Sequence, residues 1–209
     1  MPTIPYFGKH ALCVLCKIQN TKLICDACQS LVLAKSETIS QKQKALDSVI
    51  APFSFTGHVR FLIHELKFKQ ALYLTDFFVQ AVLRIAPRTL PPNTCFVPIP
   101  LHAKRLKARG FNQAACLAKA LAKHYQVPFT PHILKKLIHT SPQSELSLKA
   151  RKHNLREAFH AEKHGYQHIV LVDDLVTSGM TASFAAKALK QAGAKHVSLW
   201  CVAETPQHQ

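Results

Sequence analysis

Apolar residues recur at helical spacing in three parts of the chain. Over 59–85 they return every three or four positions, which predicts two helices separated near Lys69. A second stripe covers 113–125, directly after Asn112, a residue type that favours helix caps. A third covers 181–192 and ends at a glycine. We expect these segments to pack their apolar faces on a common core.

Four shorter apolar runs are typical of strands. They cover 49–55, 95–99, 169–172 and 197–202. The run at 169–172 is unbroken by polar residues, as in a strand buried on both faces of a parallel sheet. Because strand, helix and strand alternate from 169 to 202, the pattern predicts an α/β fold with a central, mostly parallel sheet.

Two pairs of cysteines stand near the amino terminus, Cys13 with Cys16 and Cys25 with Cys28, with eight residues between the pairs. Four thiolates at this spacing match tetrahedral zinc, and iron is the alternative that the spacing leaves open. Disulfides are disfavoured because no export signal precedes the cysteines. A site with four protein ligands leaves no open position, so we expect a structural zinc-knuckle module.

The 209 residues are enough for one well-packed domain and one small appendage. We expect a zinc module and linker at 1–45 and an α/β domain at 46–209. The remaining cysteines, Cys95, Cys116 and Cys201, lie singly in apolar segments, where we expect them to be core residues without chemistry.

The chain carries 27 Lys and Arg against 11 Asp and Glu, a net charge of +16. Residues 97–163 hold 13 of the basic and 3 of the acidic residues, so the excess is concentrated there. This balance favours polyanionic partners. No apolar run is long enough for a membrane span. We therefore expect a cytoplasmic protein whose basic surface allows peripheral contact with the inner membrane.

The strand at 169–172 leads into two carboxylates and a small-residue turn. The glycine permits close backbone approach, the following helix start aims N–H groups at an anion, and hydroxyl groups add donors. The aspartates suit ribose hydroxyls or the outer shell of magnesium. A plain turn and helix cap is the alternative interpretation. The candidate site consists of Asp173, Asp174, Val176, Thr177, Ser178, Gly179, Met180 and Thr181.

This stretch resembles the motif of type I phosphoribosyltransferases, in which four apolar residues and two acidic residues precede a Thr/Ser-Gly-x-Thr loop. The resemblance implies a phosphoribosyltransferase-like core that binds 5-phosphoribosyl 1-diphosphate (PRPP) with magnesium. The whole chain also resembles the ComF family of competence proteins, with Phe55 in place of a common tyrosine and Ser178 in place of a common threonine. The shared features include the stretch from Asp173 to Thr181, the segments Leu66-Lys67-Phe68, Val97-Pro98-Ile99-Pro100-Leu101 and Arg109-Gly110-Phe111-Asn112-Gln113, and the series Gln143, Leu146, Arg151, Asn154 and Phe159.

Two basic segments complete the candidate site. The run from Lys104 to Arg109 suggests an anion-binding loop, and the resemblance implies that Arg105 or Lys104 binds the pyrophosphate of PRPP. The resemblance also implies a flap over 140–159 with Gln143 and Arg151, for which a solvated basic helix is the alternative. Candidate DNA contacts are Lys104, Arg105, Lys107, Arg109, Lys149, Arg151, Lys152 and Arg156.

Two classes of function are consistent with these features. The first is a DNA-handling protein of natural transformation, which takes up single-stranded DNA, binds PRPP and has a competence helicase as the partner implied by the resemblance. Its stacking aromatics could be Phe111, Tyr125 or Phe129, although each equally suits a core role. The second is a phosphoribosyltransferase acting on an unidentified acceptor, or a PRPP sensor without turnover.

Overall fold

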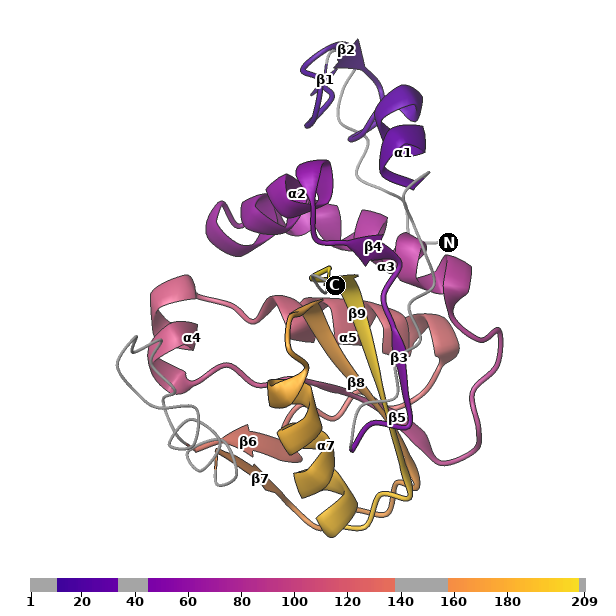
Figure 1. The fold of residues 1–209 in the computed structure, drawn as a ribbon, viewed down its shortest axis with the longest axis vertical. Helices are drawn as coiled ribbons and strands as arrows, with labels where there is room; N and C mark the ends of the chain where they lie inside the picture. Colours follow the sequence, from indigo (N-terminus) through magenta and orange to yellow (C-terminus); the bar gives the residue numbers. More distant parts are fainter. Residues whose placement is uncertain (1–10, 34–44, 138–157, 207–209) are drawn as a thin grey trace.

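A parallel sheet forms the centre of the protein (Figure 1). This computed structural model describes residues 11–33, 45–137 and 158–206. The strand order is β3-β9-β8-β5, and β4 also pairs with β9, with every pair parallel. The expected α/β fold with a mostly parallel sheet is therefore confirmed. The strands are β3 (Ser48–Ile50), β4 (Phe53–Ser54), β5 (Thr94–Pro98), β8 (His168–Val176) and β9 (His196–Glu204).

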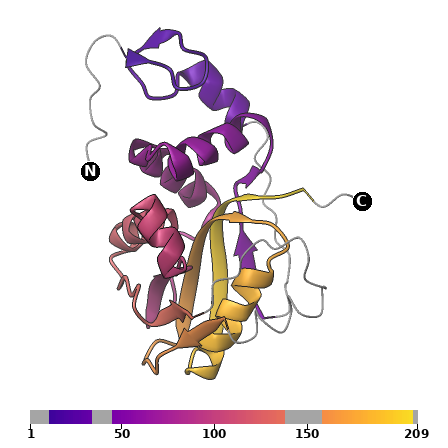
Figure 2. The same cartoon turned by 90° about the vertical axis from the view of Figure 1, so that its left-hand side faces the viewer.

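Helices cover both faces of the sheet, and Figure 2 shows the sheet between α5 and α7. On β8, Val170 and Val172 pack in the apolar cluster formed with α2, α3 and α5. The alternate residues Ile169 and Leu171 pack in the cluster formed with α7. This two-residue period buries both sides of the strand. The helices are α2 (Gly57–Phe68), α3 (Thr75–Ile85), α4 (Ala103–Arg109), α5 (Gln113–Tyr125) and α7 (Met180–Gln191), with a short 3-10 turn η1 (Leu72–Leu74).

Several expected elements are confirmed in place. Two helices, α2 and α3, separate after Lys69, where Gln70 takes a positive φ of 52°. The Asn112 side chain accepts a hydrogen bond of 3.0 Å from the backbone N–H of Ala114, so it caps α5 as its position predicts.

The prediction of one continuous strand over 49–55 is wrong. Two short strands, β3 and β4, replace it, and both pair with β9 in one register, Ile50 opposite Trp200 and Phe53 opposite Ala203. Pro52 lies between them and has no N–H to donate to the ladder.

Other differences concern polar segments that apolar spacing does not describe. A small antiparallel hairpin, β6 (Leu134–Lys136) with β7 (Phe159–Ala161), was not expected, and it flanks residues outside the described ranges. The strand β8 extends past its apolar run through Asp173 and Asp174, because β9 continues to pair with it as far as Glu204. No helix in the described ranges is long and apolar enough to cross a membrane.

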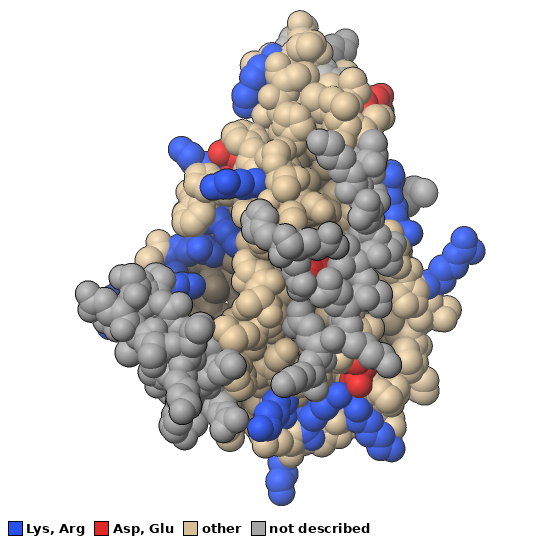
Figure 3. Space-filling model, in the orientation of Figure 1, with Lys and Arg blue, Asp and Glu red and all other residues tan. Residues whose placement is uncertain are grey.

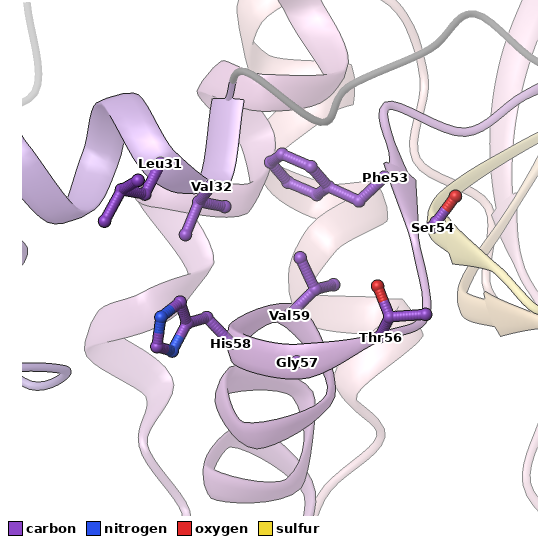
Figure 4. A pocket seen from close by; sticks show the side chains of 8 residues that line it. All are labelled: Leu31, Val32, Phe53, Ser54, Thr56, Gly57, His58 and Val59. Carbon is purple, nitrogen blue, oxygen red and sulfur yellow. The ribbon is translucent and has the colours of Figure 1, made fainter.

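The amino-terminal module consists of a hairpin and one helix, β1 (Ala11–Leu12), β2 (Gln19–Asn20) and α1 (Asp26–Leu33). Its buried side chains Cys13, Ile24 and Val32 belong to the same apolar cluster as Val59 of α2. A cavity of about 260 Å³ lies where α1 meets the start of α2. Figure 4 shows Val32, Phe53 and Val59 among the residues that line it. The module thus packs directly on the sheet domain.

Candidate functional site

The loop between β8 and α7 lies at the carboxyl edge of the sheet. Thr177 and Ser178 are exposed, and Gly179 turns the chain with φ 65°, a left-handed conformation that favours glycine. No side chain caps the first turn of α7 within the described residues, so its N–H groups remain available. An uncapped helix start beside exposed hydroxyls is a ready anion site.

The two aspartates of this edge differ in their surroundings. Asp173 is half-buried and accepts a hydrogen bond of 2.8 Å from the backbone N–H of Asp174. Burial and the charge of Asp174 raise the pKa of Asp173 well above its ordinary value of 3.8. Hydroxyl donors or a divalent cation at this carboxylate would relieve that cost.

Asp174 is paired with a lysine from another helix. Its side chain is 3% exposed, and Lys67 Nζ of α2 lies 2.9 Å from its Oδ2 in an ion pair outside hydrogen-bonding geometry. Lys67 therefore neutralises the buried carboxylate and leaves Asp173 as the more accessible one. The sequence supplied Lys67 only as part of a family pattern, and its contact with Asp174 was not expected.

A basic group of β6 lies within electrostatic range of Asp173. Lys136, at the end of β6, is half-buried, and burial together with the charge of Arg105 lowers its pKa, whereas the charge of Asp173 raises it. Lys136 of β6 therefore interacts electrostatically both with Arg105 of α4 and with Asp173 of β8. Lys136 was absent from the expected site because it lies in a short polar strand with no motif.

The basic run at 104–109 is a helix rather than the expected loop. His102 Nδ1 accepts a hydrogen bond of 3.2 Å from the backbone N–H of Lys104, which caps the start of α4, and Gly110 ends it at φ 81°. No residue of α4 is buried. Lys104, Arg105 and Lys107 are exposed, so they remain accessible to an anion.

The flap candidates Gln143 and Arg151 lie outside the described residues, together with the DNA candidates Lys149, Lys152 and Arg156. The described residues on either side of these candidates lie next to each other. The backbone N–H of Leu137 donates a hydrogen bond of 2.8 Å to the carbonyl of Ala158. Their roles stay predictions.

The proposed stacking aromatics are all half-buried. The ring of Tyr125 packs 5.9 Å from Phe96 and 5.7 Å from Trp200, and its hydroxyl donates to the carbonyl of Pro87 at 2.6 Å. Phe129 belongs to the same apolar cluster. Tyr125 and Phe129 are therefore core residues, which was the alternative interpretation of each.

The four amino-terminal cysteines converge. All four are free thiols, and their Sγ atoms lie within 4.8 Å of one another. The Cys16 and Cys25 sulfurs are 3.7 Å apart, close to the roughly 3.8 Å between ligands of a tetrahedral site with Zn–S bonds of about 2.3 Å. The fold thus brings the two cysteine pairs together in a geometry that could hold a metal ion.

The thiols of this cluster have unequal pKa values. Burial raises the pKa of Cys13, but the backbone N–H groups of Cys25, Cys16 and Leu15 outweigh it and lower that pKa to about 6. Sulfur contact with Cys25 and burial raise the pKa of Cys28 to about 12. The four sulfurs cannot all ionise side by side without a cation.

Comparison with known proteins places the chain. No model of a known protein family matches it. Competence protein F of Haemophilus influenzae is 26% identical over 211 residues, covering 95% of this chain and 92% of that protein. The DNA utilization protein YhgH of Salmonella typhi is 33% identical over 172 residues, covering 79% and 75%. The chain belongs to the ComF family. Competence protein ComFC of Bacillus subtilis is 27% identical over 187 residues, and this match covers 88% of this chain and 68% of that protein.

One solved structure, of an allosteric regulatory enzyme of purine biosynthesis, is similar to this ComF-family chain at 18% identity. Its TM-score is 0.38, and the match covers 61% of this chain and 24% of that one. The α/β fold is established independently by the parallel pairing of its own strands.

Segments that underlie the ComF resemblance meet around the carboxyl edge of the sheet. Lys67 contacts Asp174, as described above. Arg109 donates a hydrogen bond of 2.8 Å to the side chain of Gln113. The side-chain amide of Asn112 donates a hydrogen bond of 3.0 Å to the carbonyl of Ile99, the residue that follows β5. The segment around Lys67 and the two segments around Ile99 and Asn112 therefore support one edge of the sheet.

Proposed function

We propose that this protein handles DNA in natural transformation and binds PRPP at the carboxyl edge of its sheet. The observation that carries the proposal is the edge from Asp173 to Thr181 in a chain of the ComF family. The names of its relatives, competence protein and DNA utilization protein, support the DNA role. The net charge of +16 suits a nucleic-acid partner.

Each part of PRPP has a suitable partner at this edge. The start of α7 and the hydroxyls of Thr177, Ser178 and Thr181 would bind the 5-phosphate. Asp173 would accept hydrogen bonds from the ribose hydroxyls or hold magnesium through water, and Asp174 would keep Lys67 in place. Lys136, which interacts electrostatically with Asp173 and Arg105, would bind the diphosphate together with Arg105 and Lys104 of α4.

The donor set of four cysteines fits zinc, and we propose zinc as its structural ion. Its tetrahedral preference for thiolates matches the sulfur cluster, and a divalent cation would stabilise the ionised forms. The proposal places the protein in the cytoplasm, where its basic surface can contact the inner membrane and a competence helicase is its expected protein partner.

Fluorescence anisotropy with a labelled oligothymidylate tests the DNA role. We expect binding that weakens with salt, with a slope of log K against log salt of about −2 to −3 if three or four phosphates are neutralised. Absence of binding at low salt, or binding insensitive to salt, would contradict the proposal. Release of pyrophosphate from PRPP with a particular base would instead identify a phosphoribosyltransferase.

A further inference from the structure

An exposed aromatic stripe runs along the solvent face of α2. At about 100° per residue, Phe61, His64 and Phe68 fall within about 60° of one another. They lie opposite the buried face, which carries Val59, Leu62, Ile63 and Leu66. Phe61 is 40% exposed and Phe68 is 61% exposed. Large rings in such positions gain nothing from the core, so their exposure needs another explanation.

Other large apolar side chains are exposed on elements next to α2. Nine large apolar side chains are exposed within the described ranges, and five of them lie on α2, the turn that follows it and α4. An exposed apolar area of this kind marks an interaction surface. The five are Phe61, Phe68, Leu72, Tyr73 and Leu106.

One basic side chain of α4, that of Arg109, contacts the aromatic stripe. The Arg109 guanidinium carbon lies 5.2 Å from the centre of the Phe68 ring, and His64 packs 4.7 Å from that ring on the same helix. Figure 3 shows Lys and Arg side chains gathered on the flank where α2 and α4 lie, beside a hollow in the surface. Lys104, Arg105 and Lys107 of α4 point to solvent, and Glu65 is the acidic residue of α2.

We propose that α2 and α4 form a binding surface for single-stranded nucleic acid, with bases stacked on Phe68 and Phe61 and phosphates bound by Lys104, Lys107 and Arg109. Positive grooves that follow the backbone and aromatic rings that stack on bases are the two components of such sites. Arg109, held by Gln113 and by the Phe68 ring, joins the two components in one place. This inference rests on the proposed DNA role and locates it.

The surface begins one residue from the proposed PRPP site. Lys67, which pairs with Asp174, precedes Phe68 on α2. Arg105, which acts electrostatically on Lys136 near Asp173, belongs to α4. A nucleic acid on this surface would therefore lie beside the carboxyl edge of the sheet rather than on the amino-terminal module.

Anisotropy with oligothymidylate and a matched abasic oligonucleotide tests the surface. Phe68→Ala should weaken oligothymidylate binding by about 5-fold to 150-fold, the range for loss of one stacked base, with an unchanged salt slope. Phe68→Tyr should keep the affinity. Lys107→Ala should instead lower the magnitude of the salt slope by about 0.7. Ile18→Ala, at a 67% exposed apolar position on the amino-terminal module, is the matched control.

The abasic oligonucleotide separates stacking from general damage. It should bind wild type more weakly than oligothymidylate does, and Phe68→Ala should reduce the difference in affinity between the two oligonucleotides. Unaltered thermal melting of Phe68→Ala would show that the fold is intact. A uridylate oligomer reports whether the surface prefers RNA.

The outcomes distinguish this inference from the DNA role itself. If wild type binds no oligonucleotide, the proposed DNA role fails. If wild type binds and Phe68→Ala, Phe61→Ala and Lys107→Ala bind equally well, the surface is overturned and a protein partner becomes the better occupant of the aromatic stripe.

Discussion

Lys67 and Asp174 form an ion pair between helix and sheet with most of its area buried. The lysine side chain is 19% exposed and the aspartate 3%. Replacing only the lysine leaves a buried carboxylate without a cation, which is costly because the charge cannot reach water. The pair therefore fixes α2 against the carboxyl edge of β8.

Lys67→Met should lower the free energy of unfolding by roughly 3 kcal/mol, the lower end for breaking a buried ion pair, since Lys67 is partly exposed. Urea unfolding measures it. Adding Asp174→Asn should restore most of the loss, because the uncompensated charge is then gone. Equal stability of wild type and Lys67→Met would show that the contact contributes nothing.

A second carboxylate, Glu204, is 2% exposed, and neither of its oxygens has a hydrogen-bond partner among the described residues. Burial raises its pKa above the ordinary 4.5. A raised carboxyl pKa favours the protonated form in the folded state. Its contribution is therefore most favourable below the unfolded pKa and is lost as the pH rises through the folded pKa.

Glu204→Gln should accordingly stabilise the protein at pH 7, by on the order of 1 kcal/mol, because it removes a buried charge. The difference from wild type should shrink as the pH falls and disappear below about pH 3.5, where the glutamate is mostly protonated in both states. Thermal unfolding across this pH range measures the effect. A variant that is less stable than wild type at pH 7 would show that the carboxylate has a stabilising partner.

At the scale of elements, Asn112 joins two segments that enclose α4. Its carbonyl oxygen caps α5 at Ala114, and its amide donates to the carbonyl of Ile99. Asn112 therefore links the segment before α4 to the start of the helix after it.

Asn112→Ala should lower the free energy of unfolding by about 1–2 kcal/mol through loss of the cap. Asn112→Asp keeps the acceptor that caps α5 and removes only the N–H donor to Ile99, so it should lower the free energy of unfolding by less. Urea denaturation compares the two variants. If the aspartate variant loses as much as the alanine variant, the contact with Ile99 rather than the cap is the stabilising one.

Elements with a regular apolar period were predictable from the sequence, and elements made of polar residues were not. The helix at 113–125 and the strand at 169–172 occur as expected, because their spacing alone defines a buried face. The hairpin β6–β7 and the helix α4 bury few or no apolar residues, so no period identified them. Lys67 and Lys136 reach the site through contacts between distant segments, which spacing cannot encode.

At the scale of the whole molecule, the cysteine module and the sheet domain share a hydrophobic core. Cys13 and Cys28 are buried in the cluster that contains Leu62 and Leu66 of α2. Loss of the metal should therefore disturb more than the module, because its packing against α2 depends on the position of these cysteines.

Metal analysis should find one zinc ion per chain, and a strong chelator should make the four module thiols reactive and lower the Tm. Cys28→Ser should lose the metal, whereas Cys116→Ser, at a half-buried cysteine outside the cluster, should keep it. Metal-free protein with the Tm of wild type would contradict a structural ion.

The carboxyl edge of the sheet brings together what a ribose phosphate needs. An uncapped helix start, exposed hydroxyls and an accessible carboxylate lie together between β8 and α7, and Lys136 of β6 interacts electrostatically with that carboxylate. Binding of PRPP at this edge is the claim on which the functional proposal depends.

Isothermal titration calorimetry with PRPP in the presence of magnesium tests that claim most directly. Wild type should bind one PRPP per chain, and Asp173→Asn and Thr181→Val should each weaken binding by at least about 10-fold, the loss expected for a hydrogen bond to a charged group. Lys187→Ala, at an exposed position on α7, should bind as wild type does. No binding by wild type, or equal binding by all four proteins, would contradict a PRPP site at this edge.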